Sequence, residues 1–146
     1  MRLVSILEDH SIEKRIAVTP ETAKKFISLG IKVTLQEGYG NHLGFLDNNY
    51  KDLGVEIVKE EKDIFDKADI IAQLGLPSNE KLSYLKNNQS IIGVLNPFLN
   101  KEKIDELIKK KINSFSLELL PRITRAQSMD ILSSQANLAG YKAVIE

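Results

Sequence analysis

Residues 19–35, TPETAKKFISLGIKVTL, contain the start, the buried face and the end of a helix, followed directly by a strand. Thr19 is a typical N-cap residue, and Pro20 is a residue type that suits the first helical position. Apolar residues then recur at helical spacing, and Gly30 is a typical residue just past a helix end. The alternating residues Ile31–Leu35 predict a strand. This stretch therefore predicts a helix that begins at Pro20 and ends before Gly30, followed by a strand. Together they form the helix and the second strand of a strand–helix–strand unit.

The rest of the chain repeats this alternation. Apolar runs of strand length predict strands at Leu3–Leu7, Val55–Val58, Asp69–Leu74, Ser90–Leu95 and Ile112–Leu117. Helices are expected at Lys62–Ala68, at Pro77–Leu85 and from an N-cap at Asn100 to the lysines 109–111. Continuous apolar strands alternating with helices predict a mainly parallel sheet with helices on both faces and right-handed crossovers. We therefore expect residues 1–146 to form one three-layer α/β domain, flavodoxin-like or Rossmann-like, that ends in a long helix.

Composition excludes several classes of protein. Twenty basic and twenty acidic residues leave no net charge, so neither nucleic acid nor an anionic membrane is indicated as a partner. The absence of cysteine excludes disulfides, thiolate metal sites and a cysteine nucleophile, and two histidines do not make a zinc site. The first ten residues, MRLVSILEDH, carry acids and no long apolar stretch, so we expect neither a signal peptide nor membrane insertion, and a cytoplasmic location.

A glycine-rich segment, Glu37–Gly44 (EGYGNHLG), follows the strand expected at residues 31–35. A dinucleotide-binding loop requires G-x-G-x-x-G opening directly into a helix, so that backbone N–H groups meet a pyrophosphate. Position 43 is leucine, and polar residues follow at 47–49. We therefore interpret the segment as an ordinary turn and expect this chain alone to bind no dinucleotide tightly.

Charged residues just before the first helix form a second candidate site. Arg15, next to Glu13 and Lys14, could hold a carboxylate or phosphate near a helix N-terminus, and a solvated loop is an equally good interpretation. His10 and His42 have no carboxylate or hydroxyl partner at a telling spacing. We interpret both as surface residues without a functional role.

A loop dense in hydrogen-bonding side chains precedes the last helix. Arg122, Arg125, Gln127 and Asp130 lie within nine residues, more directional groups than a connector needs. Structural roles also suit these residues, because Thr124 to Gln127 fits an S/T-x-x-E/Q capping box and Asp130 fits a first helical turn. From the residue types alone, the structural interpretation is favoured.

The final helix mixes small and bulky residues on several sides. Its small residues are Ser133, Ser134, Ala136, Ala139, Gly140 and Ala143, and its bulky ones are Leu138, Tyr141 and Ile145. Such a helix is expected to have close neighbours all round, as between two packed bodies. No glycine, asparagine or proline ends it after residue 140, so we expect the natural protein to continue past Glu146.

Three segments resemble a known family: Glu13–Pro20 (EKRIAVTP), Glu37–Gly40 (EGYG) and Leu120–Glu146 (LPRITRAQSMDILSSQANLAGYKAVIE). They resemble the N-terminal domain of the alpha subunit of proton-translocating, Re/Si-specific NAD(P) transhydrogenase, a fold shared with alanine dehydrogenase. The E-x-R-x-A-x-T-P element is common to both enzymes, whereas PRITRAQSMDILSS is close to a transhydrogenase signature. The resemblance covers the whole chain.

The resemblance implies an oxidoreductase subunit of two lobes, of which this chain is the first. The second, a Rossmann lobe that binds NAD(H), is absent here, and NADP(H) is carried by a partner subunit. Hydride passes directly between the two nicotinamide rings and is coupled to proton translocation, so this chain alone is expected to be inactive. Implied partners are the missing lobe and the NADP(H)-binding and membrane-spanning subunits. A homodimer of the complete subunit and a location peripheral to the inner membrane are also implied.

By the resemblance, the loop reaches the nicotinamide end of the cofactor. Arg122 would steady the nicotinamide carboxamide and the phosphate side, and Gln127 would bridge to the NADP(H)-carrying subunit or to the ribose. Asp130 and Ser133 would hold the ribose. None of these residues acts as an acid or base, and no metal is implied. The contribution of the protein is therefore alignment, in which a slight misplacement is costly in rate.

Two positions depart from alanine dehydrogenase. Where those enzymes carry a lysine and a histidine that hold and protonate the keto acid, this chain has Gly75 and Asn96. Arg15 remains as a possible anion contact without those partners, so an alanine dehydrogenase-like substrate domain is a poor alternative. The other alternative is a non-catalytic assembly module, in which the lobe only docks onto its partners.

Overall fold

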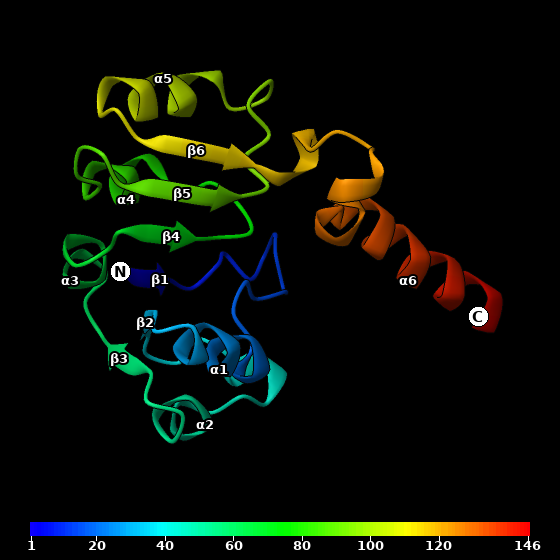
Figure 1. Cartoon of the computed structure of the whole chain (residues 1–146), viewed down its shortest axis with the longest axis horizontal. Helices are drawn as coiled ribbons and strands as arrows, with labels where there is room; N and C mark the ends of the chain where they lie inside the picture. Colours follow the sequence, from blue (N-terminus) through cyan, green and yellow to red (C-terminus); the bar gives the residue numbers. More distant parts are fainter.

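The computed structural model describes residues 1–146 and contains one six-stranded sheet with helices (Figure 1). The strands are β1 Arg2–Ser5, β2 Lys32–Gln36, β3 Glu56–Val58, β4 Ile70–Ala72, β5 Ser90–Gly93 and β6 Asn113–Ser116. The α-helices are α1 Pro20–Ser28, α2 Asp47–Lys51, α3 Glu61–Asp66, α4 Asn79–Ser83, α5 Lys101–Lys109 and α6 Ile131–Ile145. Short 3-10 helices lie at η1 Asn41–Leu43, η2 Leu117–Leu119 and η3 Thr124–Met129.

All neighbouring strands of the sheet are parallel, and their order is β3-β2-β1-β4-β5-β6. The three-layer α/β prediction is therefore confirmed, and the order is that of the Rossmann fold, since the flavodoxin order begins β2-β1-β3. The direction in which successive strands are added reverses between β1 and β4. In such sheets ligands bind outside the carboxyl ends of the strands at this reversal.

The helices cover the two faces of the sheet unequally. On one face α1 and α2 pack over β1 to β3, with a core that includes Leu35 and Tyr50. On the other face α3, α4 and α5 pack over a core that includes Ile71 and Ile91. Phe115 on β6 is 56% exposed, so the apolar cover of the first face ends before this edge strand.

Local signals in the sequence account for several element boundaries. Thr19 is the N-cap of α1, where its hydroxyl accepts a hydrogen bond from the Thr22 N–H at 3.2 Å, and Gly30 has a φ of 78°. Both predictions for this helix are confirmed. Asn100 precedes α5 as predicted, but its side chain donates to the carbonyls of Leu95 and Asn96 and does not cap the helix. The structure also contains α2, which we did not predict, because its short and mainly polar sequence, DNNYK, has no apolar periodicity.

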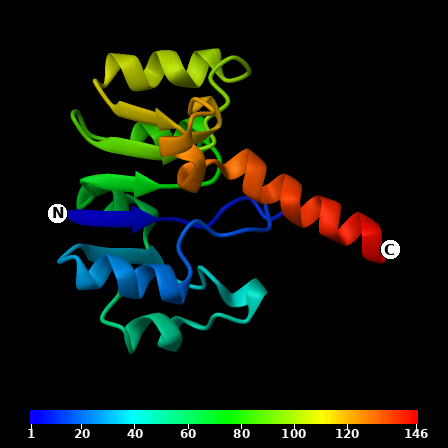
Figure 2. The same ribbon diagram turned by 45° about the vertical axis from the view of Figure 1, so that its right-hand side comes forward.

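The C-terminal segment, residues 120–146, leaves the body after β6 and η2 and projects away from it (Figures 1 and 2). We call this segment the arm. It consists of η3 and α6, and all side chains of α6 from Leu132 onward are exposed. None of the helices has the length and apolarity that crossing a bilayer requires.

Candidate functional site

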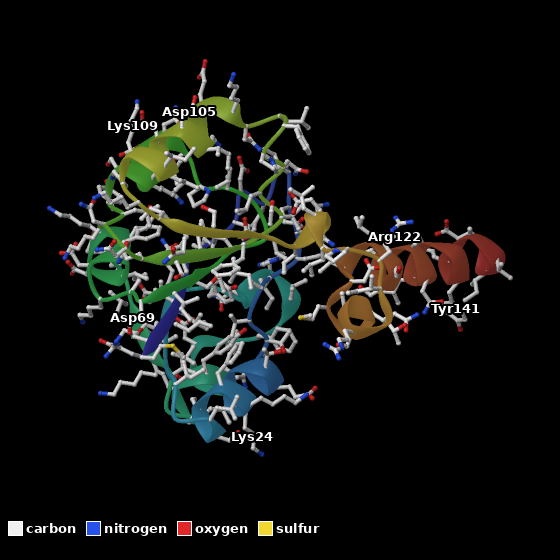
Figure 3. All side chains as sticks on the ribbon, turned by 45° about the horizontal axis from the view of Figure 1, so that its top comes forward. Lys24, Asp69, Asp105, Lys109, Arg122 and Tyr141 are labelled. Carbon is white, nitrogen blue, oxygen red and sulfur yellow. The ribbon has the colours of Figure 1, made fainter.

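The base of the arm encloses a shallow pocket of about 250 Å³. It is lined by Pro121, Arg122, Ile123, Thr124, Ala126, Gln127, Asp130 and Ser133. All four residues that we predicted to contact the cofactor are among them. Figure 3 shows Arg122 on the arm, outside the sheet body.

The side chains of Arg122 and Gln127 are exposed, and neither makes a hydrogen bond or ion pair within the chain. Their predicted positions in a loop that can face a ligand are therefore compatible with the structure. Arg125 is also exposed, but it lies outside the pocket. The fold brings only one of the two arginines of this loop to the pocket.

Asp130 is the N-cap of α6, and its backbone is extended, with φ −75° and ψ 97°. Its carboxylate accepts hydrogen bonds from the N–H groups of Leu132 and Ser133, at 3.0 and 3.1 Å, and from the Ser133 hydroxyl at 2.6 Å. The prediction that Asp130 lies within the first helical turn is wrong by this one position. The shift matters chemically, because a capping carboxylate is held in place by the helix N-terminus.

The predicted capping box from Thr124 to Gln127 is wrong. These residues form η3, whose N-cap position is Ile123 with no side-chain cap, and α6 begins only at Ile131. Asp130 lies directly before that helix and supplies the cap, so the threonine and glutamine are not needed for it. Gln127 therefore does not have the capping role that the sequence suggested for it.

Protonation of Asp130 is expected to loosen the start of α6. The Ser133 hydroxyl, together with the N–H groups of Ser133 and Leu132, holds the pKa of Asp130 below its ordinary value. A lowered folded-state pKa means that the stabilising effect is complete above the pKa of an unfolded aspartate, about 3.9, and is lost as pH falls through the folded value. In an NMR titration the amide signals of Leu132 and Ser133 should move together at low pH. Asp130→Asn should cap without titrating, so the same movement in that variant would contradict this assignment.

The last helix lacks the neighbours that its sequence predicts. Its bulky residues Leu138, Tyr141, Val144 and Ile145 are 60%, 70%, 87% and 66% exposed. Within residues 1–146 the expectation of close packing all round is therefore not met. Figure 3 shows Tyr141 on the projecting part of the arm, away from the sheet.

A larger pocket of about 560 Å³ lies at the carboxyl ends of β1 and β4, where the strand order reverses. It is lined by Glu8, Gln73, Gly75 and Lys81, among others. The Glu8 carboxylate accepts hydrogen bonds from the Leu74 N–H at 2.6 Å and the Gly75 N–H at 3.4 Å, and burial raises its pKa. We did not predict a role for Glu8. Its position directly after a buried strand could have indicated one, because ligands bind at the carboxyl ends of the strands in parallel sheets.

Arg15, the candidate anion contact, is already paired. Its Nε and Nη2 donate to the two carboxylate oxygens of Glu13 at 2.8 and 2.6 Å. This hydrogen bonding holds the pKa of Glu13 below its ordinary value. An anion would therefore have to compete with a bidentate partner that is close in sequence and half-buried.

His10 and His42 are exposed, as predicted, but they are not isolated. Their ring centroids are 3.9 Å apart, and His42 Nε2 lies 2.8 Å from the Lys14 carbonyl oxygen. The chain contains no group of three or more metal-ligating side chains placed to hold an ion.

The glycine-rich segment is a turn, as predicted, and it places a buried tyrosine. Gly38 has a φ of 76°, and a Cβ on Gly40 would lie 2.8 Å from the Cβ of Phe45. The Tyr39 hydroxyl accepts hydrogen bonds from the N–H groups of Ala17 and Val18, at 3.0 and 3.2 Å. The turn thus holds the backbone that follows Arg15.

Removing the Tyr39 hydroxyl should destabilise the fold. Tyr39→Phe leaves the buried Val18 N–H and its half-buried neighbour without their acceptor, which costs about 1–3 kcal/mol. Urea denaturation followed by circular dichroism measures this change. Tyr84→Phe is the matched control, because the Tyr84 hydroxyl makes no hydrogen bond, and equal losses in both variants would contradict the role of Tyr39.

Comparison with known proteins identifies the family. Residues 6–139 match the family model described as alanine dehydrogenase/PNT, N-terminal domain. The chain belongs to this family. The resemblance inferred from the E-x-R-x-A-x-T-P element and the PRITRAQSMDILSS segment is thereby confirmed.

Within the alanine dehydrogenase/PNT family, the transhydrogenase relatives are clearly similar. The first part of the NAD(P) transhydrogenase subunit alpha of Rickettsia prowazekii is 41% identical over 151 aligned residues, covering 100% of this chain and 39% of that protein. A crystal structure of the transhydrogenase from Sinorhizobium meliloti has a TM-score of 0.88 and 38% identity, covering 97% of this chain and 43% of that one. This chain therefore spans about two fifths of the length of these relatives.

The alanine dehydrogenase branch of the family shares the fold. A structure of L-alanine dehydrogenase has a TM-score of 0.76 at 19% identity, over 81% of this chain. Gly75 and Asn96, the two positions at which we expected a departure from alanine dehydrogenase, lie in different surroundings. Gly75 lines the pocket between β1 and β4, whereas Asn96 is an exposed turn residue with a φ of 45° outside it.

Proposed function

We propose that this chain is the N-terminal lobe of the NAD(H)-binding alpha subunit of a proton-translocating NAD(P) transhydrogenase. The observation that carries the proposal is the pocket at the base of the arm, which gathers the four residues of the transhydrogenase-like loop. The similarity to the first part of the NAD(P) transhydrogenase alpha subunit in two bacteria, Rickettsia prowazekii and Rhodospirillum rubrum, supports it. Hydride transfer would then require the other parts of that enzyme.

The side chains of the arm pocket suit the ribose and nicotinamide end of NAD(H). Arg122 and Gln127 are free to donate hydrogen bonds, and the Oδ2 atom of Asp130 accepts only one hydrogen bond, from Ser133. A ribose hydroxyl could therefore still donate to Asp130, while Arg122 contacts the carboxamide and phosphate side. Bound NAD(H) would supply the hydride chemistry, and these residues would only hold and orient it.

Several further assignments belong to the same proposal. The NAD(H)-binding Rossmann lobe and NADP(H) on a partner subunit would complete the site, and this chain alone would be inactive. The complete subunit would form a homodimer, located in the cytoplasm and bound to the inner membrane through membrane-spanning partner subunits. The exposed apolar residues of α6 support the presence of a neighbouring lobe or subunit, because exposed apolar patches of this kind mark interaction sites.

The second candidate is a lobe that docks onto partners without contributing to hydride transfer. The exposed apolar residues of α6 favour docking onto a partner under either candidate. The unpaired side chains of Arg122 and Gln127 in the arm pocket favour a further role in aligning the cofactor. An alanine dehydrogenase-like substrate domain is disfavoured by Gly75 and Asn96, which offer neither an ammonium group nor an imidazole.

A substitution at Gln127 separates alignment from docking. Gln127→Asn in the assembled enzyme withdraws the amide by one methylene, and we expect hydride transfer to slow about tenfold because misplacement by about 1 Å is costly. Single-turnover oxidation of NADH with assembly checked by gel filtration is the measurement. Gln135→Asn, at an exposed residue of α6 outside the arm pocket, is the control and should leave the rate unchanged. A normal rate in the Gln127 variant at normal assembly would favour docking.

A further inference from the structure

The arm is joined to the sheet body by few directional contacts. The hydrogen bonds of residues 120–146 are made within residues 117–146, and its one ion pair, Lys142–Glu146, is also internal. Ala126, at 5% exposure, is the only buried residue of the arm. The direction in which the arm leaves the body therefore depends on η2, the short helix at its root.

One side chain of η2 connects this root to a second part of the body. The Glu118 Oε1 atom accepts a hydrogen bond from the Asn96 N–H at 2.6 Å and another from the Ser116 hydroxyl at 2.7 Å. Asn96 lies after β5, has a φ of 45°, and accepts hydrogen bonds through its own carbonyl from the N–H groups of Leu99 and Asn100. The carboxylate thus joins the end of β6 to the turn that leads into α5.

The second oxygen of Glu118 does not contribute to this connection. Oε2 is buried and has no hydrogen-bond partner within the chain. Because both contacts use Oε1, an amide oxygen at the same place could accept the same two hydrogen bonds. The connection therefore depends on an acceptor at this position and not on the charge.

We propose that Glu118 is a positioning residue, which sets the direction of the arm and thereby the location of Arg122, Gln127 and Asp130 relative to the sheet. This inference rests on the proposed function for its effect on catalysis. Its structural aspect is independent of that function. Glu118 does not line the arm pocket, and its two hydrogen bonds go to Asn96 and Ser116, so it would act by fixing the root from which the arm leaves the body.

The structural aspect is tested by a distance measurement in the full chain. The chain contains no cysteine, so Lys24→Cys on α1 and Lys142→Cys on α6, both exposed, accept a single pair of spin labels. Glu118→Ala should widen the distance distribution measured by pulsed electron paramagnetic resonance, and Glu118→Gln should restore the original width. Ser114→Ala is the control and should leave the distribution unchanged, because Ser114 is an exposed residue of β6 whose hydroxyl makes no hydrogen bond. An unchanged distribution in Glu118→Ala would overturn the proposal.

The catalytic aspect is tested in the assembled enzyme. Glu118→Ala should lower kcat about tenfold with little change in the KM for NADH, since alignment is lost while the binding groups remain, and Glu118→Gln should retain most of the rate. If Glu118→Ala does not fold, Glu118→Asp replaces it, because it keeps the charge and withdraws the acceptor by one methylene. A widened distribution with an unchanged rate would overturn the positioning role. If Arg122 and Gln127 variants are also unaffected, the proposed function itself fails.

Discussion

Gly93→Ala is expected to destabilise the fold by at least about 3 kcal/mol. A Cβ at this position would lie 1.8 Å from the carbonyl oxygen of Gln73 and 2.9 Å from its carbonyl carbon. Both contacts are with backbone, which is held by the hydrogen bonds Gln73 N–H to Ile92 O, 3.0 Å, and Val94 N–H to Leu74 O, 2.9 Å. The two strands cannot admit the methyl group without losing this ladder.

Thermal unfolding measures the effect of Gly93→Ala. A loss of about 3 kcal/mol corresponds to a fall of roughly 6–12 °C in Tm for a domain of this size. Gly140→Ala is the matched control, because no atom lies within 4 Å of the added Cβ and alanine favours a helix. If the two variants have equal Tm values, the close approach of β4 and β5 does not limit this position.

Arg122→Ala is expected to slow hydride transfer in the assembled enzyme about 100-fold. The guanidinium lines the arm pocket, is exposed and has no partner within the chain, so its hydrogen-bonding groups are available to the cofactor. Its removal should lower kcat more than the affinity for NADH, because the proposed role is orientation. Single-turnover kinetics together with an NADH titration separate the two quantities.

Arg125→Ala is the control for this experiment. It removes the same charge and the same number of atoms three residues further along the chain, in η3 and outside the pocket. We expect it to leave the rate within about twofold of the parent enzyme. Equal effects of the two substitutions would show that the loop needs its charge and not a contact at Arg122, and the assignment of the pocket would fail.

The regular elements could be predicted because their signals are local. The segment at residues 19–35 carries a cap, an apolar stripe and a stop, and the helix Pro20–Ser28 and strand Lys32–Gln36 follow. The apolar run at 69–74 also forms a strand, although only Ile70–Ala72 are paired as one. The neighbouring Gln73 is buried and uses its side chain to bond the backbone of Ile6.

Other features have no signal in the sequence around them. The tyrosine of EGYG accepts hydrogen bonds from residues more than twenty positions earlier, and the requirement for glycine at 93 arises from a strand reached by a separate crossover. No motif or spacing singles out Glu118, yet its carboxylate joins the end of β6 to the turn that leads into α5. At the arm, Asp130 caps the helix in place of the predicted threonine, because the intervening residues fold as a 3-10 turn.

The amino-acid sequence by itself determined the alternation of strands and helices, the parallel sheet and the resemblance to the family, because caps, periodicity and short motifs act between near neighbours. The tertiary structure alone decided the order of the strands, the network around Tyr39 and the close approach of Gly93 to the Gln73 carbonyl. These depend on distances between segments that only the closed sheet brings together.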